Sequence, residues 1–325
     1  MIKAGIFGAP DLKTKELVRL LLNHPDIELT CIVSPRYTGK KISSVIGDLY
    51  GDTELCFSGS LDASALNVLF ICNDTDRILS PEKLLSENEK LKIVSLEYSP
   101  DPDSAPATIH GSLVPAESDS LVYGLPEINR KALVRGARAA YCPTPLAMAT
   151  VLALFPLAKN LILTADIDVS VVSPDRNIAN VAKEITTALQ SIQTSFNSAV
   201  NISYSHADSL QPRTTTVQVT VHCNIDTSEI RRLFDEAYDD HNFTYLLPSG
   251  TDADPENVLR TNKCLISIEE NSDGELMITS TVDNLLKGAA GNAVHCMNLL
   301  FMLHEKTGLS LIGGADFHRN DLLEF

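Results

Sequence analysis

Short apolar runs alternate with segments of helical periodicity over the first hundred residues. The runs are rich in Ile, Val and Leu, which is typical of buried strands. They lie at residues 2–7, 26–34, 67–72 and 91–96. Leucines recur at helical spacing between residues 12 and 21, and residues 81–90 predict a second helix. This alternation predicts an α/β fold with a doubly wound parallel sheet of the Rossmann type, which binds ligands at the carboxyl ends of its strands.

The pattern changes after a continuously apolar helix predicted at residues 146–157. Strands with clear apolar–polar alternation follow at residues 169–172, 200–204, 214–223, 264–268 and 276–282. A helix with one apolar stripe lies among them, at residues 178–196, and a last helix is predicted at 290–304, with Gly308 as its stop. Neighbouring strands with few helices predict a second domain of α+β type with a mostly antiparallel sheet. We therefore expect one domain from residues 1–142 and 286–325, and another from 143–285.

The composition excludes several classes of protein. Of the 325 residues, 44% are hydrophobic and 21% are charged, which excludes bulk disorder. The net charge of −16 makes nucleic acids and anionic membranes unsuitable partners, because their phosphates repel acidic side chains. No apolar run is long enough to span a bilayer and no signal peptide is visible, so we expect a cytoplasmic protein. Seven scattered cysteines without a CxxC pair favour neither disulfides nor a metal site.

A glycine-containing turn joins the first strand to the first helix. In dinucleotide-binding folds this turn directs backbone N–H groups at the pyrophosphate. Gly5, Gly8 and Ala9 suit that role, whereas Asp11 stands where a third glycine is expected. Asp11 is also a good N-cap for the following helix, and its carboxylate would then fill the anion niche itself. Nucleotide binding and simple capping both stay open.

The second strand is followed by a basic loop without an acidic residue. Ser34 and Arg36 lie where a dinucleotide fold recognises the ribose of the cofactor. A hydroxyl and a guanidinium there suit a 2′-phosphate, so NADP(H) is the expected cofactor. A solvated basic loop explains the same residues equally well.

Several longer stretches resemble one known family. They are Val282 to Phe301 near the C-terminus, Val122 to Glu127, and Phe155 to Lys159. These stretches are similar to N-acetyl-γ-glutamyl-phosphate reductase of arginine biosynthesis, a family of semialdehyde-dehydrogenase type, and the resemblance spans nearly the whole chain. It implies a Rossmann domain that binds NADPH, with Lys287, Gly288 and Asn292 at the cofactor. It also implies a second domain that carries catalysis and the oligomer interface.

The resemblance breaks down where it implies catalysis. In the family, a cysteine thiolate attacks an acyl phosphate, NADPH reduces the resulting thioester, and a histidine acts as acid and base. A gapped match makes Cys142 the nucleophile; an ungapped match puts Pro145 there and makes Cys142 an ordinary buried cysteine. Val181 stands at the histidine position, and a valine side chain cannot transfer a proton. The expected substrate loop is shortened at residues 173–177, and residues 73–76 replace a His-Gly turn.

Two functions follow from this pattern. The first is NADPH-dependent reduction of an acyl phosphate to a semialdehyde, with the activity weakened or lost. The second is a catalytically silent paralogue that acts as a binding or regulatory subunit, as a homo-oligomer or paired with an active paralogue. New chemistry in the same cleft is a third reading that no group of residues supports. Because the departures cluster at one site while the scaffold motifs survive, we expect that the reductase chemistry is weakened or gone.

Overall fold

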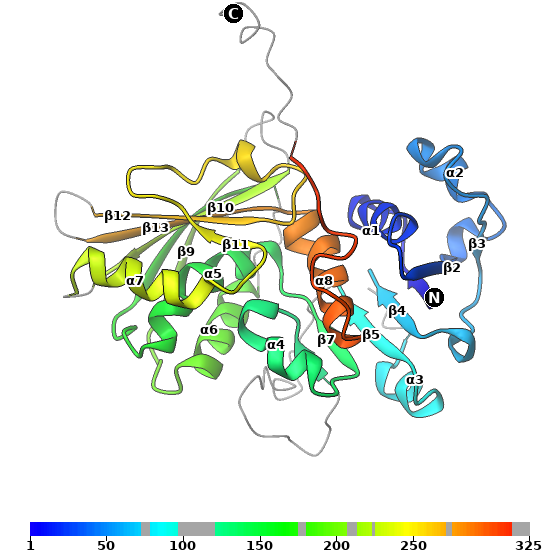
Figure 1. Ribbon diagram of the computed structural model, residues 1–325, viewed down its shortest axis with the longest axis horizontal. Coiled ribbons are helices and arrows are strands. Elements are labelled where there is room, and N and C mark those ends of the chain that lie inside the picture. The colour runs from blue at the N-terminus through cyan, green and yellow to red at the C-terminus, as the bar shows by residue number, and fades with distance from the viewer. Residues whose placement is uncertain are drawn as a thin grey trace, which may run out of the picture.

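A computed structural model describes residues 1–72, 79–96, 121–174, 180–206, 213–222, 225–270 and 275–313. Two sheets with helices packed against them organise these residues (Figure 1). The first sheet has the strand order β3-β2-β1-β4-β5-β7-β6 and the second the order β11-β12-β13-β10-β8-β9. The boundaries expected between the two domains, at residues 142 and 286, stay a prediction.

The first sheet is parallel throughout the described residues. Its strands are β1 (Ile2–Phe7), β2 (Ile27–Val33), β3 (Phe57–Ser58), β4 (Val68–Ile71), β5 (Lys92–Ser95), β6 (Leu121–Tyr123) and β7 (Ala139–Tyr141). β4 is buried at every position, because helices cover both faces of the sheet. The predicted Rossmann-type sheet is confirmed, and the carboxyl ends of β1, β2, β4 and β5 meet at one edge.

Helices from both ends of the chain pack on this sheet. They are α1 (Leu12–Leu22), α2 (Ile42–Val45), α3 (Pro81–Glu87), α4 (Pro126–Val134), the π-helical segment η5 (Leu286–Ala290) and α8 (Gly291–Leu300). Short 3-10 turns are η1 (Pro35–Tyr37), η2 (Gly47–Leu49), η3 (Ala63–Ala65) and η4 (Pro255–Val258). Buried residues of α8 and η5 share one apolar core with α1, β1 and β2. The C-terminal helix therefore returns to the N-terminal sheet.

The end of α8 differs from the sequence-based expectation. The helix ends at Leu300 and not at residue 304, because Met302 adopts a left-handed backbone with φ of 55°. Gly308 is not the stop. It also has a positive φ, of 70°, and a Cβ there would lie 2.4 Å from the buried His24 ring. Gly308 therefore allows the chain after α8 to pass close to His24.

The second sheet is mixed. Its strands are β8 (Ile167–Ser173), β9 (Val200–His206), β10 (Thr214–Val221), β11 (Thr244–Leu246), β12 (Cys264–Glu270) and β13 (Leu276–Asp283). The pairs β8–β10, β10–β13 and β12–β13 are antiparallel, and β8–β9 and β11–β12 are parallel. The helices α5 (Pro145–Lys159), α6 (Val181–Ile192) and α7 (Thr227–Tyr238) pack beneath the sheet in Figure 1. The predicted α+β organisation is confirmed.

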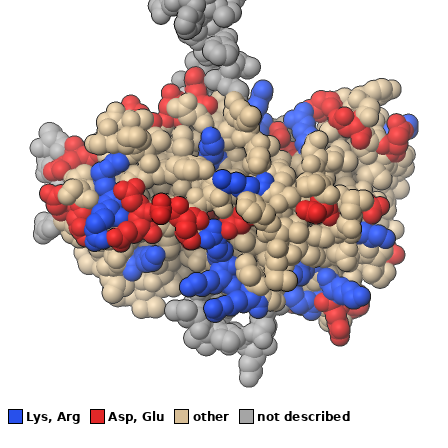
Figure 2. Space-filling model, in the orientation of Figure 1, with Lys and Arg blue, Asp and Glu red and all other residues tan. Residues whose placement is uncertain are grey.

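The negative charge is spread unevenly over the surface. Figure 2 shows acidic side chains gathered in a band on the side of the molecule where α7 lies. The exposed face of α7 contributes Glu229, Asp235, Glu236 and Asp239. Arg232 forms ion pairs with Glu229 and Glu236 within this face. The exposure of these side chains makes the band a solvated helix face.

Candidate active site

The turn after β1 is built around Gly8 and Asp11. Gly8 has a φ of 149°, and its N–H donates to the Val33 carbonyl over 3.1 Å, which ties the turn to β2. The Asp11 carboxylate accepts the Thr14 N–H at 2.8 Å, and the Thr14 hydroxyl donates to the Ala9 carbonyl at 2.7 Å. Asp11 is therefore the N-cap of α1, as predicted. Its carboxylate accepts the Thr14 N–H, which could otherwise donate a hydrogen bond to a bound phosphate.

Gly5 has a packing role in β1. A Cβ at this position would lie 2.6 Å from Leu66 Cδ1 and 3.1 Å from Cys31 Sγ. The lack of a side chain therefore lets neighbouring side chains approach the strand. Its predicted part in the cofactor site stays a prediction.

The loop after β2 presents two cations. Ser34 is buried, and its N–H donates to the Ser58 carbonyl at 2.9 Å. Arg36 and Lys40 are exposed, and their charged groups lie 5.7 and 5.6 Å from the Tyr37 ring centre. Within the described part of the chain, neither cation forms an ion pair. Both are thus available to a phosphate at the carboxyl edge of the sheet.

Cys142 lies directly after β7 and is fully buried. Its N–H donates to the Ser95 carbonyl at 2.8 Å, so the chain still follows β5 at this point. The Cys142 thiol neighbours the Cys296 thiol in α8. The Cys296 thiol donates to the Gly124 carbonyl at 3.4 Å. Burial raises the pKa of the Cys296 thiol, and the Cys142 thiol raises it further. This interior position is typical of a structural cysteine.

Pro145 is the first residue of α5 and is buried. A Cβ on Gly288 would lie only 2.8 Å from Pro145 Cβ, so η5 packs directly on the proline. The preceding residue, Thr144, caps α5 by accepting the Ala147 N–H at 3.3 Å. Proline has no N–H of its own to offer. Contacts within the protein therefore occupy the start of α5.

Glu184 in α6 adds a further internal contact to this helix start. Its carboxyl group accepts the Thr144 N–H at 3.1 Å and the Thr144 hydroxyl at 2.8 Å. The side chain is almost fully buried, and burial raises the pKa of Glu184 to about 8 although both hydrogen bonds from Thr144 oppose the rise. The burial of Glu184 was not predicted from the sequence. A glutamate on the apolar stripe of a predicted helix was the available signal.

Val181, at the position expected for the catalytic histidine, begins α6 and is buried in the core between α5 and the second sheet. The side chain contributes packing at this point. Residues 73–76 and 175–177, where the sequence departs from the family pattern, lie outside the described residues.

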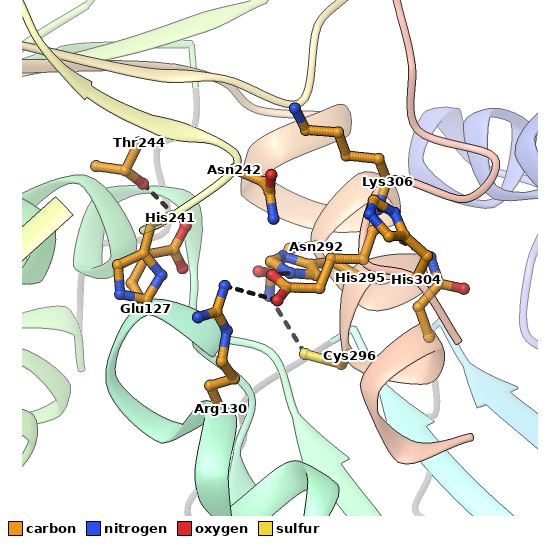
Figure 3. Close-up of polar contacts among 12 residues, drawn as sticks. Glu127, Arg130, His241, Asn242, Thr244, Asn292, His295, Cys296, His304 and Lys306 are labelled. Atoms are coloured by element: carbon orange, nitrogen blue, oxygen red, sulfur yellow. Dashed lines mark hydrogen bonds and ion pairs between the residues drawn. The ribbon is translucent and has the colours of Figure 1, made fainter. Parts of the chain in front are cut away.

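Polar side chains of the C-terminal motif form hydrogen bonds and an ion pair inside the protein. Lys287 Nζ lies 2.6 Å from Glu127 Oε1, and both side chains are at most 1% exposed. The Thr244 hydroxyl donates to the same oxygen at 2.8 Å (Figure 3). Burial opposes ionisation of Glu127, but the Lys287 ammonium and the nearby His295 and His241 together outweigh it, and the pKa of Glu127 falls to about 2. The Asn292 amide donates to the Gly124 carbonyl at 2.6 Å.

These contacts give Lys287 and Asn292 internal roles. Gly288, between them, packs on Pro145 as described above. The cofactor contacts expected for these three residues stay a prediction. The Glu127–Lys287 pair itself was not expected from the sequence, because its partners lie 160 residues apart.

A second polar group adjoins this pair (Figure 3). Arg130 in α4 forms an ion pair with Glu305 at 2.6 Å, and His295 Nε2 lies 2.8 Å from the other Glu305 oxygen. Burial opposes ionisation, but the His295 hydrogen bond and the Arg130 guanidinium lower the pKa of Glu305 to about 2. Burial lowers the pKa of His295, so its imidazole is neutral at pH 7. The group joins α4, α8 and the segment after α8.

No group of His, Cys, Asp and Glu side chains in the described residues could hold a metal ion. Of the helices described, none is long and apolar enough to cross a membrane.

The fold and the domain order define a class of protein. Residues 3–135 match the model of the semialdehyde dehydrogenase NAD binding domain, and residues 181–284 match that of the semialdehyde dehydrogenase dimerisation domain. Aspartate semialdehyde dehydrogenase II of Vibrio cholerae, solved with ASA, has the same fold with a TM-score of 0.66 at 15% identity. The match covers 93% of this chain and 98% of that one. The NADP-bound enzyme of Candida albicans has a TM-score of 0.63 at 13% identity, with 93% and 98% coverage.

The relatives define the family within this class. N-acetyl-gamma-glutamyl-phosphate reductase of Parabacteroides distasonis is 36% identical over 96% of this chain and 98% of its own length. The protein of the same name in Bacteroides thetaiotaomicron is 34% identical with the same coverage. The chain therefore belongs to the N-acetyl-γ-glutamyl-phosphate reductase family. The NAD binding domain supports a nicotinamide cofactor, and the dimerisation domain supports self-association.

Proposed function

We propose that this chain is a member of the reductase family that binds NADP(H) and has lost acyl-phosphate reduction, so that it acts as a binding or regulatory subunit. The observation that carries the proposal is Pro145, which begins α5 at the position of the family nucleophile in the ungapped match. A proline ring offers no nucleophile, and it is packed against Gly288. Val181 offers no proton-transfer group at the second catalytic position. In the ungapped match the chain therefore lacks both the nucleophile and the proton-transfer group of the family reaction.

Cys142 is the group on which an active reductase would depend. Its full burial beside Cys296 supports a structural role, because a thiol hidden from solvent cannot meet a substrate. We expect iodoacetamide to modify the exposed Cys56 in the folded protein and to leave Cys142 unmodified until urea unfolds it. Peptide mass spectrometry after timed quenching measures both rates in one sample. Labelling of Cys142 at the rate of Cys56 in the folded state would support the active reductase instead.

The preference for NADP(H) is attributed to the loop after β2. Arg36 is exposed and free of ion pairs among the described residues, beside Ser34 at the end of the strand. We expect Arg36→Gln to weaken NADPH binding about tenfold, since a charge-assisted hydrogen bond to the 2′-phosphate is lost. NADH has no such phosphate, so its affinity should not change. Isothermal calorimetry with both nucleotides measures the effect, and an equal loss for both would refute the assignment.

Self-association is proposed through the second domain. The family model matched there is a dimerisation domain, and the partner is a second copy of this chain or an active paralogue. A small-molecule acyl phosphate or semialdehyde is the ligand class expected beside the nucleotide. Co-purification of a tagged chain with an untagged copy and with a paralogue distinguishes the two partners.

A further inference from the structure

A groove lies between α1 and the end of the second sheet, apart from the residues assigned to nucleotide and catalysis. Its volume is about 630 Å³, within the usual range of small-molecule sites. One wall is the face of α1 from Leu12 to Asn23, a helix of 11 residues and thus about 16 Å long. The opposite wall comes from Arg213, Arg260 and the start of η5. Neither Gly8, Arg36, Cys142 nor Pro145 lines it.

Four cations line this groove in a chain whose net charge is −16. They are Lys15, Arg19, Arg213 and Arg260, and Glu16 is the acidic residue among the lining. Lys15 and Arg19 both pair with the partly exposed carboxylate of Asp48, and Arg19 also pairs with Glu16 at 3.5 Å. Arg260 has no ion-pair partner within the described residues. The positive charge of the groove is therefore only partly neutralised by the protein.

Arg213 binds two carboxylates of the protein and keeps one donor without an acceptor among the described residues. Its Nε donates to the fully buried Asp283 at 2.7 Å, and its Nη1 donates to Glu16 at 3.0 Å. Its Nη2 is buried, yet it has no hydrogen-bond acceptor among the described residues. A buried guanidinium donor without an acceptor is costly, so an acceptor that reaches Nη2 would be favourable. The contact with Glu16 shows that a carboxylate reaches the guanidinium from the α1 side.

The remaining lining is apolar. Leu12 is 64% exposed at the first position of α1, and Leu285, Leu286 and Leu311 contribute from the other side. An aliphatic ligand that covers an exposed leucine removes apolar surface from water, and this lowers the free energy of the complex. A bare inorganic anion would leave these side chains in water.

We propose that this groove binds a small aliphatic carboxylate, with its acid group at Arg213 and Arg260 and its hydrocarbon part on the leucines. The site is separate from the proposed nucleotide loop after β2, so loss of NADP(H) binding would not remove it. The arrangement joins α1 to the second sheet, and a ligand there contacts both.

Octanoate is a suitable probe for the full-length protein, because it combines one carboxylate with an aliphatic chain. We expect one octanoate per chain by isothermal calorimetry. Octylamine, of the same length but opposite charge, and inorganic phosphate should each bind at least about tenfold more weakly.

Two variants locate the site. Arg260→Gln removes an exposed cation and should weaken octanoate binding about tenfold. Leu12→Asp places a carboxylate in the groove and should weaken binding by about tenfold or more; it stands at an exposed helix start where aspartate is favourable, so the protein should fold. Lys131→Gln, at an exposed lysine of α4, is the matched control and should bind like the wild type.

The proposal is overturned by three results. One is no octanoate binding to the folded wild type. The second is equal binding by the wild type, Arg260→Gln and Leu12→Asp, which would put the ligand elsewhere. The third is phosphate binding as tight as that of octanoate, which would mean that the groove selects charge without the hydrocarbon part.

Discussion

Lys287→Met is expected to destabilise the protein by about 3–5 kcal/mol, because it leaves the Glu127 carboxylate buried without its counter-ion. Both side chains are at most 1% exposed, so water cannot replace the lost partner. The Thr244 hydroxyl would be the remaining described donor to Glu127 Oε1, while Oε2 already has no partner among the described residues. Methionine fills the volume of the lysine stem, so the effect reports the charge and not a cavity.

Urea unfolding followed by far-UV circular dichroism measures this effect; the chain has no tryptophan to follow. The double variant Glu127→Gln with Lys287→Met removes both charges and should recover a large part of the lost stability. Lys131→Met, at an exposed lysine, should change stability by less than about 0.5 kcal/mol. If the double variant is as unstable as the sum of its two single variants, the pair does not act as an ion pair.

Glu184→Gln is expected to be more stable than the wild type by about 5 kcal/mol at about pH 9. An unfolded glutamate ionises near pH 4.5, whereas burial raises the pKa of Glu184 to about 8 in the folded protein. The stability that protonated Glu184 contributes is complete below pH 4.5 and is lost as the pH rises through 8. Glutamine does not ionise, and its amide can accept the Thr144 N–H and donate to the Thr144 hydroxyl.

The difference between Glu184→Gln and the wild type should therefore be small at pH 4.5, grow with pH and level off above 8. Urea unfolding at several pH values measures it, because all other titrating groups are common to both proteins. Glu28→Gln, at an exposed position of β2, is the control and should follow the wild type at every pH. A constant difference between Glu184→Gln and the wild type would mean that the pKa of Glu184 is not raised by folding.

The strands at the centre of the first sheet could be predicted from the sequence, because burial on both faces makes them continuous apolar runs. β7 was not predicted as an element, since three residues carry no periodicity and its partners β5 and β6 are supplied by the fold. α4 was missed as well. The polar Asn129 interrupts the apolar repeat of this helix. Its backbone departs from helical geometry, and its side chain donates to the Tyr123 carbonyl.

The site shows the same division between local and distant contacts. The N-cap at Asp11 was predicted, because its partner Thr14 is three residues away. The contact of Glu184 with Thr144 spans 40 residues and was not predicted. Glu127 ends a stretch that resembles the family, but the burial of Glu127 and of Glu184 depends on packing that no local pattern specifies. Such contacts become visible only when α4, α5, α6 and η5 are brought together.

The loss of reductase chemistry is tested most directly by the reverse reaction, oxidation of N-acetylglutamate semialdehyde with phosphate and NADP⁺. The reductase of Parabacteroides distasonis, 36% identical, is assayed in parallel as the active reference. We expect NADPH to form with the reference protein and not above the blank with this chain, and we expect calorimetry to detect NADPH binding by this chain. Steady NADPH formation by this chain that is abolished in Cys142→Ala would contradict the assignment of Cys142 as structural and of Pro145 as the residue at the nucleophile position.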